Sequence, residues 1–358
     1  MKDFAKFFKR YERFLVPGML LLGLLVDIVT FRTINVQTTL LLLGFYTVIA
    51  AGSIVVLNKH IPPDPTPHFA LHYARLVSPL ALQFSFGALL SGSLIFYWFS
   101  GAFSVSWPII VTTAVLMVSN DQFRHFFARP AMQIGVFYFI LFSLFSLVFP
   151  FAFNSVDPHL FLVAGMGSFV VMSVFLQWLS ARIESIKKDK RPLAAIVLAI
   201  FFAMNALYAG NIIPPIPLSL REGGVYHRIG RTGGTYRLSG EHETILERLL
   251  PGQTLHLANG EGAAVWSAIF APADLNTTIV HAWYLYDEAS RAWSQKDRLS
   301  FPLLGGRKDG FRGYSRKSSV VPGKWRVDVQ TTRGQVLGRI RFDVVRADSV
   351  PTLQEIKR

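Results

Sequence analysis

Basic side chains gather in one glycine-rich stretch near the C-terminal end, GGRKDGFRGYSRK at residues 305–317. Glycines let a backbone approach a ligand closely, and guanidinium groups hold phosphate or carboxylate through paired N–H donors. The stretch therefore predicts an anion-binding surface. Its candidate residues are Arg307, Lys308, Arg312, Tyr314, Arg316 and Lys317, with Tyr314 as a flat side wall.

The same stretch has a plainer interpretation. Lys308-Asp309-Gly310 is typical of a hairpin turn, and the cations would then only be solvated. Basic residues on strand edges also keep sheets from aggregating. If the surface does bind anions, the ligands we expect are anionic lipid, an anionic glycan or an acidic periplasmic protein. We expect no nucleic acid ligand and no cofactor.

A second set of candidate residues, which could bind a metal ion, lies in two segments closer to the N-terminus. His68 and His72 are four residues apart, and so are Asp121 and His125. Residues at this spacing share a helix face, and four such groups could bind zinc or a similar ion. An HxxxH pair alone is a weak signal, and histidines near lipid head groups are the alternative.

Signatures of catalysis are missing from the sequence. There is no cysteine, no GxSxG elbow and no HExxH motif. We therefore expect a protein without enzymatic activity. A carbohydrate-stacking surface of tryptophans is conceivable, although a sheet core explains most of them. The four tryptophans concerned are Trp266, Trp283, Trp293 and Trp325.

Long apolar segments dominate the first 213 residues. The chain is 51% hydrophobic and only 16% charged, well below the roughly 25% charged residues of a soluble domain. About 20 apolar residues are enough for a helix to cross a bilayer. The pattern predicts seven membrane spans. The lipid bilayer is therefore an expected partner of the chain. The spans cover residues 14–30, 38–57, 79–99, 102–119, 131–153, 159–179 and 192–213.

Polar residues inside these spans are functional candidates, because ionisable groups are costly in a bilayer. Asp27 lies near the outer end of its span, where it could instead reach the interface or Arg32. Amide side chains are more typical of hydrogen bonds between helices. The amides in question are Gln83, Gln133, Gln177 and Asn205.

The distribution of positive charge predicts the orientation. With the N-terminus in the cytoplasm, fourteen Lys and Arg residues fall on the cytoplasmic side, whereas the short outside loops carry only Arg32. Seven spans then place the C-terminal part outside. The N-terminus is therefore expected in the cytoplasm and the C-terminal domain outside.

After the last span, the sequence changes to alternating strand patterns with turn residues between them. In KWRVDVQT, for example, Trp325, Val327 and Val329 alternate with polar residues. Seven such segments predict an all-β, immunoglobulin-like antiparallel sandwich. The fold class is therefore an α-helical membrane bundle of about seven transmembrane helices followed by this sandwich.

The expected domain order follows. Residues 1–13 form a basic amphipathic helix on the membrane surface, and residues 14–213 form the seven-span domain. Residues 214–252 are a linker with a hairpin turning at Thr232-Gly233-Gly234 and a short helix. Residues 253–346 form the sandwich domain outside the membrane, and residues 347–358 are a loose tail.

The C-terminal segments IVHAWYLYDEASRAWSQKDRLSF, GGRKDGFRGYSRK and PGKWRVDVQTTRGQVLGRIRF resemble the bacterial domain of unknown function 2914. Here they follow a multi-span region, as in a group of uncharacterised proteobacterial membrane proteins. The resemblance implies an inner-membrane protein with a periplasmic sandwich, and it brings no reaction and no catalytic residues. The function we expect is display of this domain for binding or assembly. Two alternatives are a transporter or lipid-handling protein with a regulatory domain, and a metal-dependent membrane enzyme.

Overall fold

The computed structural model describes residues 36–59, 69–122, 129–153, 155, 157–214, 218–233, 235–241, 252–271, 277–303, 311–349 and 351–358. These residues form two compact units, one helical and one built of strands. We call them the bundle and the β domain, and we describe each by itself.

The bundle consists of long apolar helices. In chain order they are α2 (Val36–Asn58), α3 (Phe69–Ser100), α4 (Phe103–Gln122), α6 (Pro130–Ala152), α7 (Pro158–Arg182), the short α8 (Glu184–Lys188) and α9 (Lys190–Ala209). Local signals fix their ends. Asp157, for example, accepts a hydrogen bond of 2.7 Å from the backbone N–H of His159, and Pro158 occupies the first helical position.

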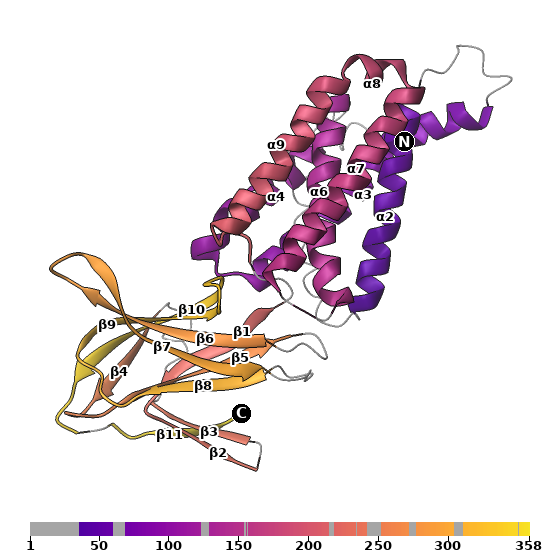
Figure 1. Ribbon diagram of the computed structural model, residues 1–358. Helices are drawn as coiled ribbons and strands as arrows, with labels where there is room; N and C mark the ends of the chain where they lie inside the picture. Colours follow the sequence, from indigo (N-terminus) through magenta and orange to yellow (C-terminus); the bar gives the residue numbers. More distant parts are fainter. Residues whose placement is uncertain are drawn as a thin grey trace, which may run out of the picture. The chain divides into compact units, whose positions relative to one another are not determined.

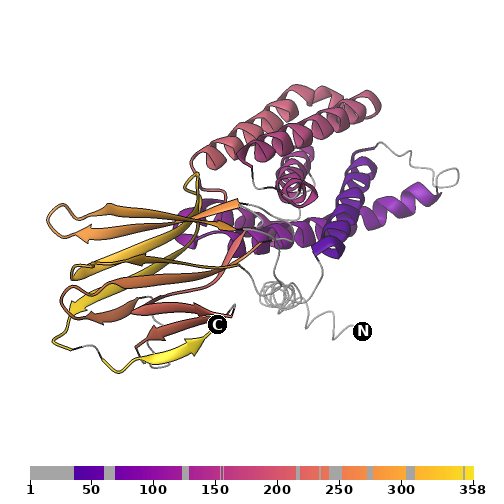
Figure 2. The ribbon, with the colours of Figure 1, turned by 60° about the horizontal axis from the view of Figure 1, so that its bottom comes forward.

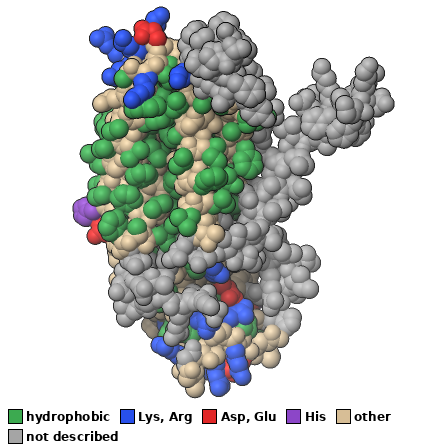
Figure 3. Space-filling model, turned by 90° about the vertical axis from the view of Figure 1, so that its right-hand side faces the viewer, with side chains coloured by type: hydrophobic (Ala, Val, Ile, Leu, Met, Phe, Trp, Pro, Cys, Tyr) green, Lys and Arg blue, Asp and Glu red, His purple; other side chains and the backbone are tan. Residues whose placement is uncertain are grey.

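Six helices of the described residues are long and apolar enough to cross a bilayer. They match the last six predicted spans. The first predicted span, residues 14–30, lies outside the described residues, as does the predicted surface helix at residues 1–13. In Figure 3, hydrophobic side chains cover the visible face of the bundle, and Lys and Arg gather at the end that carries α8. Insertion into a membrane follows from this surface.

Helices α6, α7 and α9 run side by side in Figure 1 and pack through small residues. Gly165 of α7 faces the ring of Phe142, and an added Cβ would lie only 2.9 Å from that ring. Gly135 of α6 similarly faces Ile196 of α9. Small residues at such positions let apolar helices approach closely, as expected inside a membrane.

The β domain contains eleven strands in its described residues. They are β1 (Ser219–Tyr226), β2 (Arg228–Thr232), β3 (Thr235–Gly240), β4 (Gln253–Leu257), β5 (Ala263–Phe270), β6 (Thr277–Asp287), β7 (Ala292–Leu303), β8 (Phe311–Lys317), β9 (Gly323–Thr331), β10 (Val336–Arg346) and β11 (Gln354–Lys357). Strands β4 to β10 lie where the alternating segments predicted them.

These strands form three sheets, visible as layers in Figures 1 and 2. The middle sheet has the order β1-β5-β8, the large sheet β4-β10-β9-β6-β7, and the small sheet β11-β3-β2. All neighbouring strands are antiparallel except β4 and β10, which are parallel. The expectation of an all-antiparallel sandwich is therefore wrong at this pair, and three sheets do not confirm the immunoglobulin-like arrangement.

Strand β5 explains the layering, because both of its faces are buried. Val265 and Ile269 belong to the core between the middle and large sheets, together with Trp283 and Trp325. The alternate residue Trp266 packs with Leu238 in a second core between the middle and small sheets. A strand buried on both faces reads as a continuous apolar run, which is what AAVWSAIF is.

The β domain also extends beyond the predicted limits on both sides. Residues 219–226, expected in a linker, form β1 and pair with β5. The C-terminal residues, expected as a loose tail, form β11 and pair with β3. The predicted turn at Thr232-Gly233-Gly234 coincides with the β2–β3 hairpin, whose last pair is Thr232 and Thr235. The predicted short helix at residues 241–250 lies almost entirely outside the described residues.

Candidate anion-binding surface

Strand β8 divides the predicted anion-binding residues between two faces. Arg312, Tyr314 and Arg316 lie on the face opposite Gly313, Ser315 and Lys317, because successive side chains of a strand alternate. On β5, the cross-strand partners of the first three are Ala268, Trp266 and Ala264. Tyr314 is 41% exposed, so this face is open to solvent.

The opposite face of β8 is fixed against the large sheet. Gly313 lies against the ring of Phe301, and any Cβ at this position would overlap that ring. Ser315 is buried and accepts a hydrogen bond of 3.0 Å from the indole N–H of Trp283. These contacts prevent β8 from rotating, and they hold Arg312, Tyr314 and Arg316 on the outer side.

Lys317 does not share the outer face. Its ammonium group pairs with the carboxylate of Asp297 on β7 and lies 6.0 Å from the ring centre of Trp325. The structure thus gives Lys317 a partner within the domain and separates it from the two arginines. Arg307 and Lys308 lie outside the described residues.

The small sheet adds two residues beside this face that sequence reasoning did not include. The Tyr236 hydroxyl donates a 3.0 Å hydrogen bond to the backbone carbonyl of Arg312, and its ring lies edge-on to Tyr314, with 6.1 Å between the centres. The guanidinium of Arg231 lies 5.6 Å from the centre of the Tyr236 ring. We call these five residues the β8 arginine face: Arg231, Tyr236, Arg312, Tyr314 and Arg316.

The three arginines of the β8 arginine face have no carboxylate partner among the described residues. Elsewhere in the β domain, arginines pair with acids, as Arg237 does with Glu355 and Arg358 with Glu222. Guanidinium groups without such partners keep their N–H donors available for oxyanions. The positive charge of this face is therefore open to a ligand.

A partly buried glutamate connects the three sheets through hydrogen bonds to two histidines. Glu241, just after β3, accepts a hydrogen bond of 2.9 Å from Nε2 of His227 and one of 2.8 Å from Nδ1 of His256 on β4. It also accepts 2.6 Å from the backbone N–H of His256. Burial alone raises the pKa of Glu241, but the hydrogen bonds from His256 and His227 outweigh it and hold this pKa below its ordinary value.

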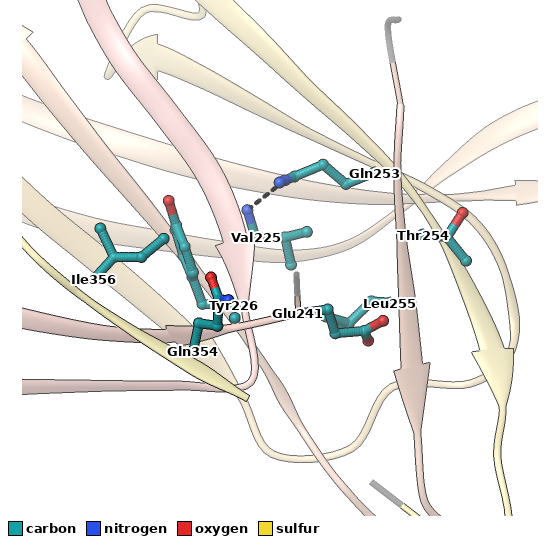
Figure 4. A pocket seen from close by; sticks show the side chains of 9 residues that line it. Val225, Tyr226, Glu241, Gln253, Thr254, Leu255, Gln354 and Ile356 are labelled. Atoms are coloured by element: carbon teal, nitrogen blue, oxygen red, sulfur yellow. Dashed lines mark hydrogen bonds between the residues drawn. The ribbon is translucent and has the colours of Figure 1, made fainter. Parts of the chain in front are cut away.

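A small cavity of about 50 Å³ lies beside Glu241. Figure 4 shows Glu241 and Leu255 on one side of it, and Tyr226, Gln354 and Ile356 on the other. Gln253 closes the top by accepting a 2.9 Å hydrogen bond from the backbone of Val225. Because both oxygens of Glu241 already accept histidine protons, we assign this group to holding the sheets together.

A serine–histidine contact lies in the core between the middle and large sheets. Nε2 of His281 is 2.8 Å from the Ser267 hydroxyl, and its Nδ1 is 2.8 Å from the Ser315 hydroxyl. Burial lowers the pKa of His281 to about 3, so its imidazole is neutral at pH 7. A hydroxyl beside an imidazole occurs in hydrolases, but all three side chains are buried here and no substrate reaches them.

The predicted metal site falls largely outside the described residues. His68 and His125 lie outside the described residues, and the side chains of His72 and Asp121 are likewise not described. In the part of the chain that the structure does describe, no three His, Asp or Glu side chains come together in a way that could hold a metal ion.

The polar residues of the described spans bind one another. Nε2 of Gln83 donates a 2.9 Å hydrogen bond to the backbone carbonyl of Asn120. In return, Nδ2 of Asn120 donates a 2.9 Å hydrogen bond to the backbone carbonyl of Gln83. Asn58 donates 2.6 Å to Gln133, which joins α2 to α6. Asn205 instead bonds within its own helix. Asp27 lies outside the described residues. Gln83 and Gln133 therefore connect helices, as interhelical hydrogen bonds do in membranes.

Comparison with known proteins adds one family. No curated protein matches the chain. Among solved structures, the chain is similar to Pseudomonas fluorescens alkylpurine DNA glycosylase AlkC bound to DNA containing an abasic site analog, at 11% identity over 84% of this chain and 97% of that chain. The TM-score is 0.23, so this likeness carries no argument. Residues 276–344, from β6 into β10, match the family described as "Protein of unknown function (DUF2914)", which confirms the resemblance of the C-terminal segments.

Proposed function

We propose that this protein is a multi-pass inner-membrane protein whose β domain stands in the periplasm and binds an anionic ligand through the β8 arginine face. The observation that carries the proposal is a set of three arginines around the exposed ring of Tyr314 that have no carboxylate partner among the described residues. Binding, and not catalysis, fits the site, because the described serine–histidine contact is closed to solvent.

The spacing of the arginines restricts the ligand. Arg312 and Arg316 are four residues apart on one strand, which separates their Cα atoms by roughly 13 Å at ~3.3 Å per residue. One carboxylate or phosphate is too small to satisfy both at once. The ligand we propose therefore carries repeated negative groups, as an acidic polysaccharide or a surface of anionic lipid does. Tyr314, between the two arginines, gives it a flat contact.

The test measures binding of the full chain in nanodiscs of phosphatidylcholine. One probe is an oligogalacturonate of ten or so sugars, and the other is vesicles that contain phosphatidylglycerol; the two separate a glycan source from a lipid source. For Arg312→Gln/Arg316→Gln we expect binding to weaken at least tenfold, because hydrogen bonds to charged groups contribute about 1.5–3 kcal/mol each.

The matched control removes two other arginines of the same domain. In Arg237→Gln/Arg346→Gln, the lost guanidiniums are ones that already bond Glu355 and Asn259. This variant has the same net charge as the test variant and should bind within about twofold of the wild type. Equal losses in both variants would mean that total charge and not the β8 arginine face attracts the probe. Unchanged binding in the test variant would also overturn the proposal.

A further inference from the structure

The outer face of the large sheet, turned away from the middle sheet, presents a second cationic group. Across neighbouring strands, Arg341 of β10 lies opposite Arg326 of β9, and Arg326 lies opposite Tyr284 of β6. In the next row, Tyr286 lies opposite Trp293 of β7. The other face of the same strands carries Trp283, Trp325 and Phe342 in the core, so alternation directs these residues outward.

Arg326 is held in place by aromatic rings. Its guanidinium carbon lies 4.5 Å from the centre of Tyr284 and 4.8 Å from the centre of Trp293. Its Nε lies 3.2 Å from the carboxylate of Asp328. Stacking and the ion pair fix the plane of the guanidinium, so little conformational entropy is lost when it binds an anion.

Among the described residues, the acids that pair near this row are shared with or taken by other cations. Asp328 is buried, and Arg339 contacts the same carboxylate oxygen at 3.0 Å. Glu288 pairs with Lys324 at 3.1 Å. Asp343, two residues beyond Arg341 on the same face, has no ion pair with it. Like charges directly opposite each other on a sheet are destabilising, and an anion between Arg326 and Arg341 would relieve this.

The neighbouring aromatic side chains restrict what the anion is attached to. Tyr286 and Trp293 are half-buried and pack edge-on, with 5.2 Å between their ring centres. Trp293 was grouped with three other tryptophans in the sequence, but those three are in the cores and Trp293 is not. The Lys324 ammonium lies 5.7 Å from the centre of the Tyr286 ring, and the Arg326 guanidinium lies over Trp293. Partly exposed aromatic rings with cations beside them suit a ligand with one apolar C–H face and one negative group.

We propose that Arg326 and Arg341 bind the carboxylate of an acidic sugar, a uronic acid, whose ring lies against Tyr286 and Trp293. This site is separate from the β8 arginine face and differs from it in kind. The two arginines are cross-strand neighbours, only about 5 Å apart at their Cα atoms, so they take one compact anion where the β8 arginine face needs a repeated one.

The experiment uses the full chain in nanodiscs of phosphatidylcholine with methyl glucuronide as the probe. Saturation-transfer NMR should detect contact between the protein and the sugar C–H groups, and titration should give the dissociation constant. Methyl glucoside, which lacks the carboxylate, should bind at least tenfold more weakly. Arg341→Gln and Trp293→Ala should each weaken glucuronide binding at least fivefold. Arg341 is exposed and has no ion-pair partner among the described residues, so this variant should fold.

Two variants separate this inference from the proposed function. Arg312→Gln/Arg316→Gln should leave glucuronide binding unchanged. Because oligogalacturonate is itself built of uronic acids, the β8 arginine face is also tested in the Arg341→Gln background, where adding Arg312→Gln/Arg316→Gln should still weaken oligogalacturonate binding at least tenfold. Equal binding of glucuronide and glucoside would overturn the role of the arginines. Unchanged glucuronide binding in Arg341→Gln, or a loss in the β8 variant as large as in Arg341→Gln, would overturn the location of the site.

Discussion

Among single residues, His281 shows how the core of the β domain uses a titratable group without catalysis. The indole of Trp283 donates to the Ser315 hydroxyl, which leaves that hydroxyl free to donate its own proton to Nδ1 of His281. The proton of the neutral imidazole then belongs on Nε2, which donates to Ser267. One tautomer thus satisfies all three polar side chains in the core.

This arrangement predicts a pH dependence of stability. Burial lowers the pKa of His281 to about 3 from 6.5, so below pH 6.5 the unfolded chain binds a proton that the folded domain does not. The contribution of His281 is complete above pH 6.5 and is lost as the pH falls toward 3. Between pH 6.5 and 5 this amounts to about 2 kcal/mol, at 1.36 kcal/mol per unit. Urea unfolding in detergent, followed by tryptophan fluorescence at both pH values, measures it.

The comparison variant is His281→Gln, which keeps hydrogen-bonding groups and cannot titrate. Its free energy of unfolding at pH 7 should be lower than that of the wild type, but it should fall less between pH 6.5 and 5, by the same 2 kcal/mol or so. Parallel pH profiles for the two proteins would show that His281 is protonated in the folded state.

Residue types and alternation predicted part of the β8 arginine face and could not predict the rest. Arg312, Tyr314 and Arg316 share a face because they are two residues apart on one strand, a local property. Arg231 and Tyr236 join them only because the β2–β3 hairpin packs on the middle sheet. Lys317 pairs with Asp297 of another sheet. Contacts of this kind depend on tertiary packing, which a single sequence does not display.

At the scale of elements, the strands that alternate over seven or more residues were predicted closely, and the shortest strand was not. QEIK, which forms β11, is four residues long with a single apolar residue, so it has no apolar alternation to detect. Its place is determined by β3, whose edge it covers. The pairing of β1 with β5 was also missed, because residues 221–226 were expected in the arm of the β2–β3 hairpin. Gly223 and Gly224 interrupt the alternation of β1, and the close side chains of Ile340 and Tyr226 leave little room for a Cβ at either position.

Strand β11 should matter for the β8 arginine face. The small sheet has β3 at its centre, and Tyr236 exchanges backbone hydrogen bonds of 2.8 and 2.9 Å with Arg358. Deleting residues 350–358 would leave a two-stranded hairpin and remove Ile356 from the second core. Isolated hairpins are marginally stable, so we expect backbone amides of β2 and β3 to exchange at least tenfold faster in hydrogen–deuterium exchange.

Amides of β6 and β9 supply the internal control for that deletion, because those strands belong to the large sheet and should keep their protection. The same truncated protein should also bind oligogalacturonate more weakly, since Arg231 and Tyr236 lose their fixed positions. Unchanged protection of β2 and β3 would show that the hairpin is held by its own packing on β5 and not by β11.

For the whole molecule, hydropathy was the most reliable signal. Six predicted spans coincide with six apolar helices of the described residues, because the bilayer imposes both length and composition. The sheet arrangement was less accessible, since the strands alone do not reveal how many layers they form. The second apolar face of β5 indicates that another layer covers it. The sequence alone does not show that β2, β3 and β11 form that layer.

Orientation is the last prediction, and it rests on parity. Seven spans and the excess of Lys and Arg on one side predict a cytoplasmic α8 and a periplasmic β domain. The chain has no cysteine, so a single introduced thiol reports its own compartment. Ser294→Cys is exposed on β7 and should react in intact cells with a maleimide that crosses the outer but not the inner membrane. Ser185→Cys, exposed on α8, should react only after the inner membrane is permeabilised. If both thiols react under the same condition, the chain crosses the membrane an even number of times between them. If Ser294→Cys reacts only after permeabilisation, the β8 arginine face lies in the cytoplasm.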